Sequence, residues 1–202
     1  GQPIALDTYV ETGALTPTLC VGLRQALEDR LNIVVAGGTS SGKTTFANAL
    51  LSEPVLSEDR IIILEDTREL HCSAEDVTQL RTHRSGITLR DLVRSTMRLR
   101  PDRIIVGEVR GPEAFDLLQA MNTGHDGSMG TLHCNSPREA ISRLESMIMM
   151  GGYQLPVHTI REMITGSIDI IIQVARLRDG SRKVTHVTEV MGMEGDVVTL
   201  QN

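Results

Sequence analysis

The sequence is poor in aromatic side chains: its 202 residues include no tryptophan, two phenylalanines and two tyrosines. A core must therefore be built from aliphatic side chains, which is common in α/β proteins with parallel sheets. The scarcity also disfavours a translocase of single-stranded nucleic acid, because such proteins stack bases on aromatic side chains. At 40% hydrophobic residues the chain can still bury a core, and we expect one domain.

The sequence also lacks a disulfide pattern and a membrane-spanning segment. Its cysteines are odd in number, widely separated and without a C-x-x-C spacing, which indicates reduced thiols in a cytosolic protein. It has no signal peptide and no apolar run of transmembrane length. We therefore expect a soluble protein with three free thiols, at Cys20, Cys72 and Cys134.

The chain has no excess of positive charge either. Its formal net charge is −6 and its pI is about 5.5, which argues against a general binder of nucleic acid or anionic membranes. The charge is uneven, however, because residues 81–103 contain seven arginines against two acidic residues. This local surplus of arginine indicates a region that meets an anion.

A phosphate-binding loop is the most specific pattern in the chain. It matches G-x-x-x-x-G-K-[ST] and lies between an apolar run at 33–36 and a helical pattern at 46–51, which is the context that this motif requires. Lys43 is expected to reach the β- and γ-phosphates, and the Thr44 hydroxyl to bind magnesium. The alternative is a Gly/Ser turn that happens to end in Lys-Thr. It does not explain why a strand pattern precedes the loop and a helix pattern follows it. The nucleotide-binding residues are predicted to be Gly37, Gly38, Thr39, Ser40, Ser41, Gly42, Lys43, Thr44 and Thr45.

Alternating strand and helix patterns predict an α/β fold with a mostly parallel sheet flanked by helices. Short apolar strands, which should be buried on both faces, are expected at 33–36, 60–64, 103–107 and 128–133. Helices are expected to start near Thr16, Thr88, Gly111, Ser136 and Pro156, where capping residues or Pro precede helical spacing. Residues 71–86 are polar and are predicted to be irregular. Antiparallel strands at 170–175, 183–190 and 196–200 should close the carboxy-terminal edge.

Residues 1–15 show no clear period, and the chain begins on Gly1 rather than methionine. We interpret residues 1–15 as the tail of a linker from a missing amino-terminal domain, and residues 16–202 as one nucleotide-binding domain.

Two glutamates end buried strands on the predicted sheet. Glu65 follows the strand at 60–64, and Glu108 follows the strand at 103–107. Ligands of open parallel sheets bind beyond the carboxyl ends of the strands, so both carboxylates could face the phosphate-binding loop. Hydrolysis of a magnesium nucleotide needs such a carboxylate to position metal-bound or attacking water. The pattern predicts a RecA-like nucleoside triphosphatase, although either acid alone could be a surface residue at the start of a loop. The absence of an Asn-Lys-x-Asp stretch disfavours a GTPase.

A helix after Thr88 would carry Arg90, Arg94 and Arg98 on one face, because they recur every four residues. Such a face could be solvated, or it could supply an arginine to the active site of a neighbouring subunit, where it would stabilise transition-state charge.

Four ordered motifs resemble those of the type II/IV secretion ATPases and cover nearly the whole chain. The phosphate-binding loop resembles Walker A, Ile63-Leu64-Glu65-Asp66-Thr67-Arg68-Glu69-Leu70 the Asp box, the stretch from Arg100 to Arg110 Walker B, and Thr123-Gly124-His125-Asp126-Gly127-Ser128-Met129-Gly130-Thr131-Leu132-His133 the His box. The Arg-Pro-Asp-Arg stretch, the Gly-Glu-Val-Arg-Gly-Pro-Glu-Ala run and the segment Leu6-Asp7-Thr8-Tyr9-Val10 look most like the conjugal-transfer, TrbB-like branch.

This resemblance implies roles for individual residues. Glu65 matches a glutamate that acts on the attacking water or the magnesium shell, and Glu108 matches the Walker B glutamate. His133, and with it His125, matches a residue that senses the γ-phosphate. Here the Walker B strand ends on Gly-Glu rather than on an aspartate pair, so the general base stays open between the two glutamates. The implied catalytic set is Glu65, Glu108, His133, Arg94, Arg98 and Arg110, and magnesium would lie near Thr44, Glu65 and Glu108.

The resemblance further implies an ATP-hydrolysing motor with ATP and Mg²⁺ as ligands. It would form a homohexamer with other secretion or conjugation proteins, peripheral to the cytoplasmic face of the bacterial inner membrane and without direct nucleic-acid binding. The motor would power pilus assembly or substrate transfer. The alternative is a nucleotide-gated protein-interaction module with little hydrolysis. Because the family's amino-terminal domain is missing, we expect this chain alone to bind ATP but to turn it over weakly.

Overall fold

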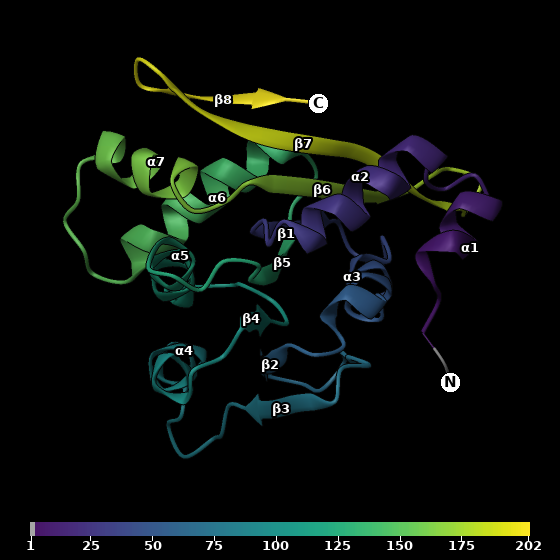
Figure 1. Cartoon of the computed structure of the whole chain (residues 1–202). Helices are drawn as coiled ribbons and strands as arrows, with labels where there is room; N and C mark the ends of the chain where they lie inside the picture. The colour runs from purple at the N-terminus through teal and green to yellow at the C-terminus, as the bar shows by residue number, and fades with distance from the viewer. Residues whose placement is uncertain (1–2) are drawn as a thin grey trace.

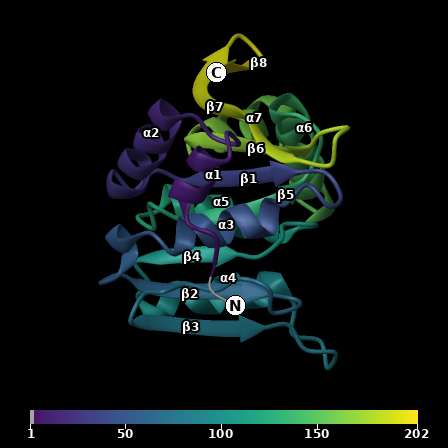
Figure 2. The ribbon, with the colours of Figure 1, turned by 90° about the vertical axis from the view of Figure 1, so that its right-hand side faces the viewer.

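The computed structural model describes residues 3–202, which form one eight-stranded sheet with helices on both faces (Figure 1). The order across the sheet is β3 (Asp76–Arg81), β2 (Arg60–Glu65), β4 (Arg103–Val106), β5 (Met129–His133), β1 (Ile33–Gly37), β6 (Ile170–Arg176), β7 (Arg182–Glu194) and β8 (Val197–Gln201). The strands from β3 to β6 are parallel, and β7 and β8 are antiparallel additions at one edge (Figure 2). This confirms the predicted α/β fold with its antiparallel carboxy-terminal edge.

Two groups of helices cover the two faces of the sheet. One face packs against α4 (Leu89–Thr96), α5 (Glu113–Asn122), α6 (Pro137–Met150) and α7 (Val157–Thr165). The other packs against α1 (Leu6–Glu11), α2 (Pro17–Glu28), α3 (Lys43–Leu51) and the short 3₁₀ turn η1 (Pro54–Leu56). Within residues 3–202, each helix is too short or too polar to cross a membrane.

The central strands are apolar because both of their faces are covered. In β2, Ile61 and Ile63 join the core on the side of α3, while Ile62 and Leu64 join the core on the side of α4. Successive side chains of a strand point to opposite faces, so one continuous apolar run supplies both cores. The sequence prediction of buried strands is confirmed for β1, β2, β4 and β5.

The prediction that residues 71–86 are irregular is wrong for the middle of this segment, because residues 76–81 form the edge strand β3. This strand lies at the edge of the sheet and, within residues 3–202, pairs with β2 alone, in a register that places Val77 beside Ile61 and Leu80 beside Leu64. Val77 and Leu80 pack against opposite cores, and the ends of the strand are exposed. An edge strand with so few buried side chains lacks the apolar run by which the central strands were identified.

The helix starts follow the predicted capping residues. Thr16 caps α2, and Thr88 caps α4 through a complete capping box with Asp91. Ser136 accepts a hydrogen bond from the backbone of Glu139, but the Glu139 carboxylate bonds to the backbone of residue 135 instead of completing the box. Arg98 lies in the 3₁₀ turn η2 (Met97–Leu99), beyond the end of α4.

The segment before α2 packs on the sheet domain. Leu6 of α1 and Leu15 are buried, and the ring of Tyr9 meets that of Phe46 edge-on at 5.2 Å between centroids. The backbone of Val184 in β7 also donates a hydrogen bond to the carbonyl oxygen of Ala14, at 2.9 Å. The interpretation of residues 1–15 as a linker tail stays a prediction, and its first two residues lie outside the described part of the chain.

All three cysteines are free thiols, as predicted. Cys134 lies directly after β5, where its backbone N–H donates to the carbonyl oxygen of Gly37 at 3.3 Å. Its side chain is fully buried, and burial raises the pKa of the Cys134 thiol to about 11, with a further increase from the nearby Glu139 carboxylate.

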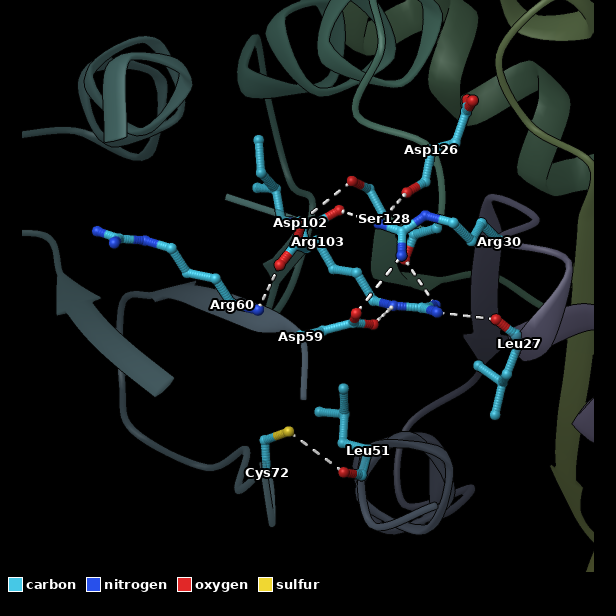
Figure 3. Close-up of polar contacts among 12 residues, drawn as sticks. Leu27, Arg30, Leu51, Asp59, Arg60, Cys72, Asp102, Arg103, Asp126 and Ser128 are labelled. Atoms are coloured by element: carbon cyan, nitrogen blue, oxygen red, sulfur yellow. Dashed lines mark hydrogen bonds and ion pairs between the residues drawn. The ribbon is translucent and has the colours of Figure 1, made fainter. Parts of the chain in front are cut away.

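A buried ion pair joins three elements at the amino-terminal edge of the sheet (Figure 3). Arg103, the first residue of β4, has 2% of its surface exposed, and its Nε lies 2.6 Å from Oδ2 of Asp59. Its Nη2 donates to the carbonyl oxygen of Leu27 at the end of α2, at 2.8 Å. Arg30 approaches the other oxygen of Asp59 at 3.5 Å. The guanidinium thereby ties α2, the turn before β2 and β4 together.

Candidate functional site

The candidate site lies at the carboxyl ends of the parallel strands, opposite the buried ion pair. The loop between β1 and α3 forms its base, and left-handed backbone conformations at Ser40 (φ +58°) and Gly42 (φ +89°) shape the turn into α3. The helix starts where the backbone N–H of Phe46 donates to the carbonyl oxygen of Gly42, at 2.9 Å. A helix N-terminus directs unpaired N–H groups and a partial positive charge toward the loop.

Neighbouring side chains approach the glycines of the loop so closely that a side chain on Gly38 or Gly42 would collide with them. A Cβ atom added to Gly38 would lie 2.8 Å from Oδ1 of Asn135, and one added to Gly42 would lie 2.7 Å from Cδ of Arg182. In the described part of the chain, the buried hydroxyl of Ser41 has no hydrogen-bond partner. A cradle of this shape, with an orphaned donor and the N-terminus of α3, fits a phosphate group.

Lys43 lies between the loop and a carboxylate. Its Nζ is 3.4 Å from the carbonyl oxygen of Gly37 and 3.4 Å from Oε1 of Glu108. With the loop, His133 and Arg182, these side chains line a cavity of about 390 Å³. The predicted association of Lys43, Glu108 and His133 is therefore present in the structure.

Glu108 is held by two cations. Its Oε2 accepts a hydrogen bond from Nε of Arg110 at 2.5 Å, and Lys43 approaches the other oxygen. Desolvation raises the pKa of Glu108, but the Arg110 hydrogen bond and the charge of Lys43 outweigh it, so the pKa lies below its usual value. The carboxylate is thus ionised at neutral pH.

Glu65 is buried at the end of β2. Its Oε2 accepts hydrogen bonds from the backbone N–H groups of Glu69 and Leu70, at 2.9 and 3.0 Å, so its carboxylate has a fixed position. A Cβ on Gly107, directly after β4, would lie 2.6 Å from Cγ of Glu65. Glycine at this position leaves space for the glutamate side chain. Glu65, Glu108, Arg110 and Thr44 line one hollow beside the loop.

The oxygen atoms in this hollow suit a magnesium ion. Mg²⁺ is commonly bound by one or two carboxylates together with phosphate oxygens and water, rather than by a cage of protein ligands. Thr44, Glu65 and Glu108 supply that limited set. Residues 3–202 contain no cluster of three or more His, Cys, Asp or Glu side chains that could hold a metal unaided. When bound, magnesium would neutralise charge on the phosphates.

The arginines of α4 lie elsewhere. Nε of Arg94 is 3.0 Å from one oxygen of Asp116, and Nε of Arg90 is 2.8 Å from the other. The Asp116 side chain is only 6% exposed, so two arginines neutralise a buried carboxylate of their own chain. Arg98 is exposed in η2. Neither Arg94 nor Arg98 lines the cavity around the phosphate-binding loop.

His125 is also separated from the site. It precedes β5, at the amino-terminal edge of the sheet, and its carbonyl oxygen accepts a hydrogen bond from the hydroxyl of Ser128, which lies near Arg103 in Figure 3. His133 lies at the opposite end of β5 and lines the cavity. Of the two histidines, only His133 meets the phosphate-binding loop.

The residues at the site that were not assigned from the sequence include Asp66, Gly107, Asn135 and Arg182. Asp66 directly follows Glu65, Gly107 directly precedes Glu108, and Asn135 lies two residues after His133, so strand-end position was an available signal. Arg182 has no such signal, because it reaches the loop from β7, where its Nε lies 3.4 Å from the carbonyl oxygen of Ser40.

Comparisons with known proteins agree with this geometry. Residues 6–198 match the model of a family described as type II/IV secretion system protein. A probable conjugal transfer protein TrbB of Sinorhizobium fredii is 45% identical over 189 residues, or 93% of this chain and 56% of that relative. Conjugal transfer protein TrbB of Rhizobium radiobacter is 44% identical over 194 residues, or 95% of this chain and 57% of that relative. The chain therefore spans about half the length of the curated relatives it matches.

A solved structure shows the same fold. The crystal structure of the VirB11 ATPase from the Brucella suis type IV secretion system, in complex with sulphate, has a TM-score of 0.79 and 30% sequence identity to this chain. The similarity covers 92% of this chain and 62% of that one. The predicted RecA-like P-loop fold and the predicted likeness to TrbB proteins are confirmed.

Proposed function

The chain belongs to the type II/IV secretion system protein family, and on this premise we propose that it is the ATP-hydrolysing domain of a motor for conjugative transfer or type IV secretion. The motor works as a hexameric ring and powers pilus assembly or substrate translocation. It acts with other proteins of the apparatus at the cytoplasmic face of the bacterial inner membrane, and it does not bind nucleic acid directly.

One observation carries the proposal: a phosphate cradle, a lysine, two carboxylates and a histidine meet at one edge of the sheet. Lys43 and Glu108 are in contact there, and Thr44 lines the same hollow as both glutamates. Binding alone needs only the loop and Lys43. The carboxylates beside Thr44 are what hydrolysis requires in addition, because water and metal must be positioned at the γ-phosphate.

The residues of this chain divide the work as follows. The backbone N–H groups of the loop and Lys43 bind the phosphates, and Thr44 orients the magnesium ion. Glu65, fixed by two backbone hydrogen bonds, and Glu108, fixed by Arg110, orient water and metal. His133 lies at the end of β5, where it faces the γ-phosphate side of the cavity.

Glu108→Gln is expected to reduce ATP turnover at least about 100-fold and to leave ATP affinity within about threefold, because the amide keeps the shape but loses the charge that positions water and metal. Phosphate release and calorimetric binding measure the two effects. Glu189→Gln removes the same charge from an exposed site on β7 and should change neither.

The same measurements separate the motor from a nucleotide-gated interaction module with little hydrolysis. If the unmodified protein binds ATP but releases phosphate no faster than Glu108→Gln in every assembly state, the interaction module is the better description.

Turnover is proposed to depend on assembly. Arg94 is already bound to Asp116 in the same chain, and Arg110 is bound to Glu108. A further cation for the transition state would therefore come from a neighbouring copy, such as the exposed Arg98. An arginine supplied across an interface raises the rate of phosphoryl transfer by about 10³–10⁵.

This dependence predicts that dilute protein hydrolyses ATP weakly and that the rate per molecule rises steeply with protein concentration. Phosphate release should be followed over a concentration series while the mass in solution is measured with and without ATP and magnesium. A constant rate per molecule across the transition from monomer to hexamer would contradict the proposal.

A further inference from the structure

Arg182 lies against the phosphate-binding loop although it belongs to a distant hairpin. It is the first residue of β7, and its Nε lies 3.4 Å from the carbonyl oxygen of Ser40. Its Cδ occupies the space into which a side chain at Gly42 would project, at 2.7 Å from the ideal Cβ position. It lines the same cavity of about 390 Å³ as Lys43 and His133. The side chain is therefore part of the cavity wall.

The order of the strands across the sheet determines which phosphate of a bound nucleotide would lie beside Arg182. β1 carries the loop. On one side of it lie β5, which ends at His133, and β4, which Glu108 follows by two residues. Strands β6 and β7 lie on the other side. A nucleotide whose γ-phosphate meets Glu108 must therefore extend its α-phosphate away from β4 and toward β7, where Arg182 projects.

The hairpin itself indicates that an anion binds there. In the register of β6 and β7, Arg176 lies directly opposite Arg182, and like charges in that position repel each other. Arg178 lies in the connecting turn and Lys183 follows, so residues 176–183 carry four cations against the single acid Asp179. A phosphate beside Arg182 would offset this repulsion.

The charge of Arg182 acts on Tyr9, an aromatic residue of α1. Burial raises the pKa of the Tyr9 phenol, and the positive charge of Arg182 opposes that rise. Tyr9 packs edge-on against Phe46 of α3, one turn beyond the loop. The side chain of Arg182 lies beside Ser40 and Gly42, where α3 begins.

We propose that Arg182 binds the α-phosphate of the nucleotide, on the side of the loop opposite Glu108. The proposal rests on the proposed function as a nucleotide-binding domain. A guanidinium has a planar set of donors that matches two phosphate oxygens, and hydrogen bonds between charged groups are stronger than neutral ones. Arg182 therefore holds the nucleotide before and after hydrolysis, because ATP and ADP share the α-phosphate.

The test is the affinity for ADP, measured by calorimetry on the unmodified protein and three variants. Arg182→Ala should weaken ADP binding about 10- to 100-fold, the loss expected for a hydrogen bond to a charged group. The ADP affinity of Arg182→Lys should lie between that of the unmodified protein and that of Arg182→Ala, because lysine keeps the charge but loses the planar donor pair. Lys183→Ala is the matched control, since adjacent residues of a strand point to opposite faces, and it should stay within about twofold.

The ³¹P spectrum of bound ADP tests which phosphate is contacted. In Arg182→Ala the resonance of the α-phosphorus should move relative to the unmodified complex, while that of the β-phosphorus, held by the loop, should stay in place. Arg182 is exposed, so the midpoint of unfolding without nucleotide should be unchanged, and a loss of affinity can be assigned to the contact.

Three results would overturn the assignment: ADP affinity of Arg182→Ala within twofold of the unmodified protein, an equal loss in Lys183→Ala, or a shift confined to the β-phosphorus. Failure of the unmodified protein to bind ADP is a separate result, which would refute the proposed function itself.

Discussion

Lys43→Ala is expected to reduce the affinity for magnesium ATP at least about 100-fold and to abolish measurable turnover. Lys43 provides the cation between the loop and Glu108, with Nζ 3.4 Å from both the Gly37 carbonyl oxygen and Glu108 Oε1. Removing it deletes a charged contact worth about 1.5–3 kcal/mol. It also leaves the ionised Glu108 facing an anionic phosphate with one cation fewer, which adds repulsion.

Calorimetric titration with ATP and magnesium measures this loss, and phosphate release measures turnover. The chain has only one other lysine, Lys183, and Lys183→Ala is the matched control, which should retain both activities. An unchanged affinity in Lys43→Ala, with the fold intact by circular dichroism, would contradict the assignment of the loop as the phosphate site. The rise of turnover with assembly could not then be interpreted as nucleotide chemistry at this site.

Asp59→Ala is expected to lower the free energy of unfolding by about 3–5 kcal/mol, the cost of leaving a buried charge without its partner. Arg103 is 2% exposed and its Nε lies 2.6 Å from Asp59 Oδ2 (Figure 3). The backbone carbonyl of Leu27 would still accept one hydrogen bond, but it carries no full charge. Urea unfolding, followed by far-ultraviolet circular dichroism, measures the change.

The surface pair between Arg24 and Asp7 provides the control. These side chains are 41% and 69% exposed at a distance of 2.9 Å, and exposed pairs contribute about 0–1 kcal/mol. Asp7→Ala should therefore change the unfolding free energy by less than about 1 kcal/mol. In the double variant Asp59→Leu with Arg103→Met the buried charge is gone, and most of the lost stability should return. If Asp59→Ala and Asp7→Ala cost the same, the ion pair does not hold this edge of the sheet together.

The parts of the fold that the sequence predicted are those encoded by local patterns. Buried parallel strands appear as unbroken apolar runs, so β2 and β4 could be identified, and the ends of parallel strands meet at one edge, so Glu65 and Glu108 were expected together. Edge strand β3 was not predicted, because few of its side chains are buried and its sequence therefore shows no apolar run. Arg98 was placed on the face of α4 because the pattern of every fourth residue does not show where a helix tightens into a 3₁₀ turn.

Contacts between distant segments could not be predicted in the same way. Arg182 reaches the loop because the parallel strand β6 and the antiparallel strand β7 extend the sheet past β1, and its sequence neighbourhood is a turn with basic residues. Asp116 forms ion pairs with both Arg90 and Arg94 because α4 packs against α5. The residue spacing within either helix does not reveal this packing. The residues found by motif thus lie at strand ends, whereas the contacts of Arg182 and Asp116 form where separate elements pack.

The thiol beneath the phosphate-binding loop has a consequence for the conditions under which the domain can work. With its pKa raised to about 11, the Cys134 side chain is almost entirely a thiol at pH 7, whereas the thiolate is the nucleophile that attacks peroxides and disulfides. The backbone of the same residue supports Gly37 at the start of the loop. The sulfur atom in that position is therefore a weak nucleophile, and burial of the protonated thiol disfavours oxidation beside the support of the loop.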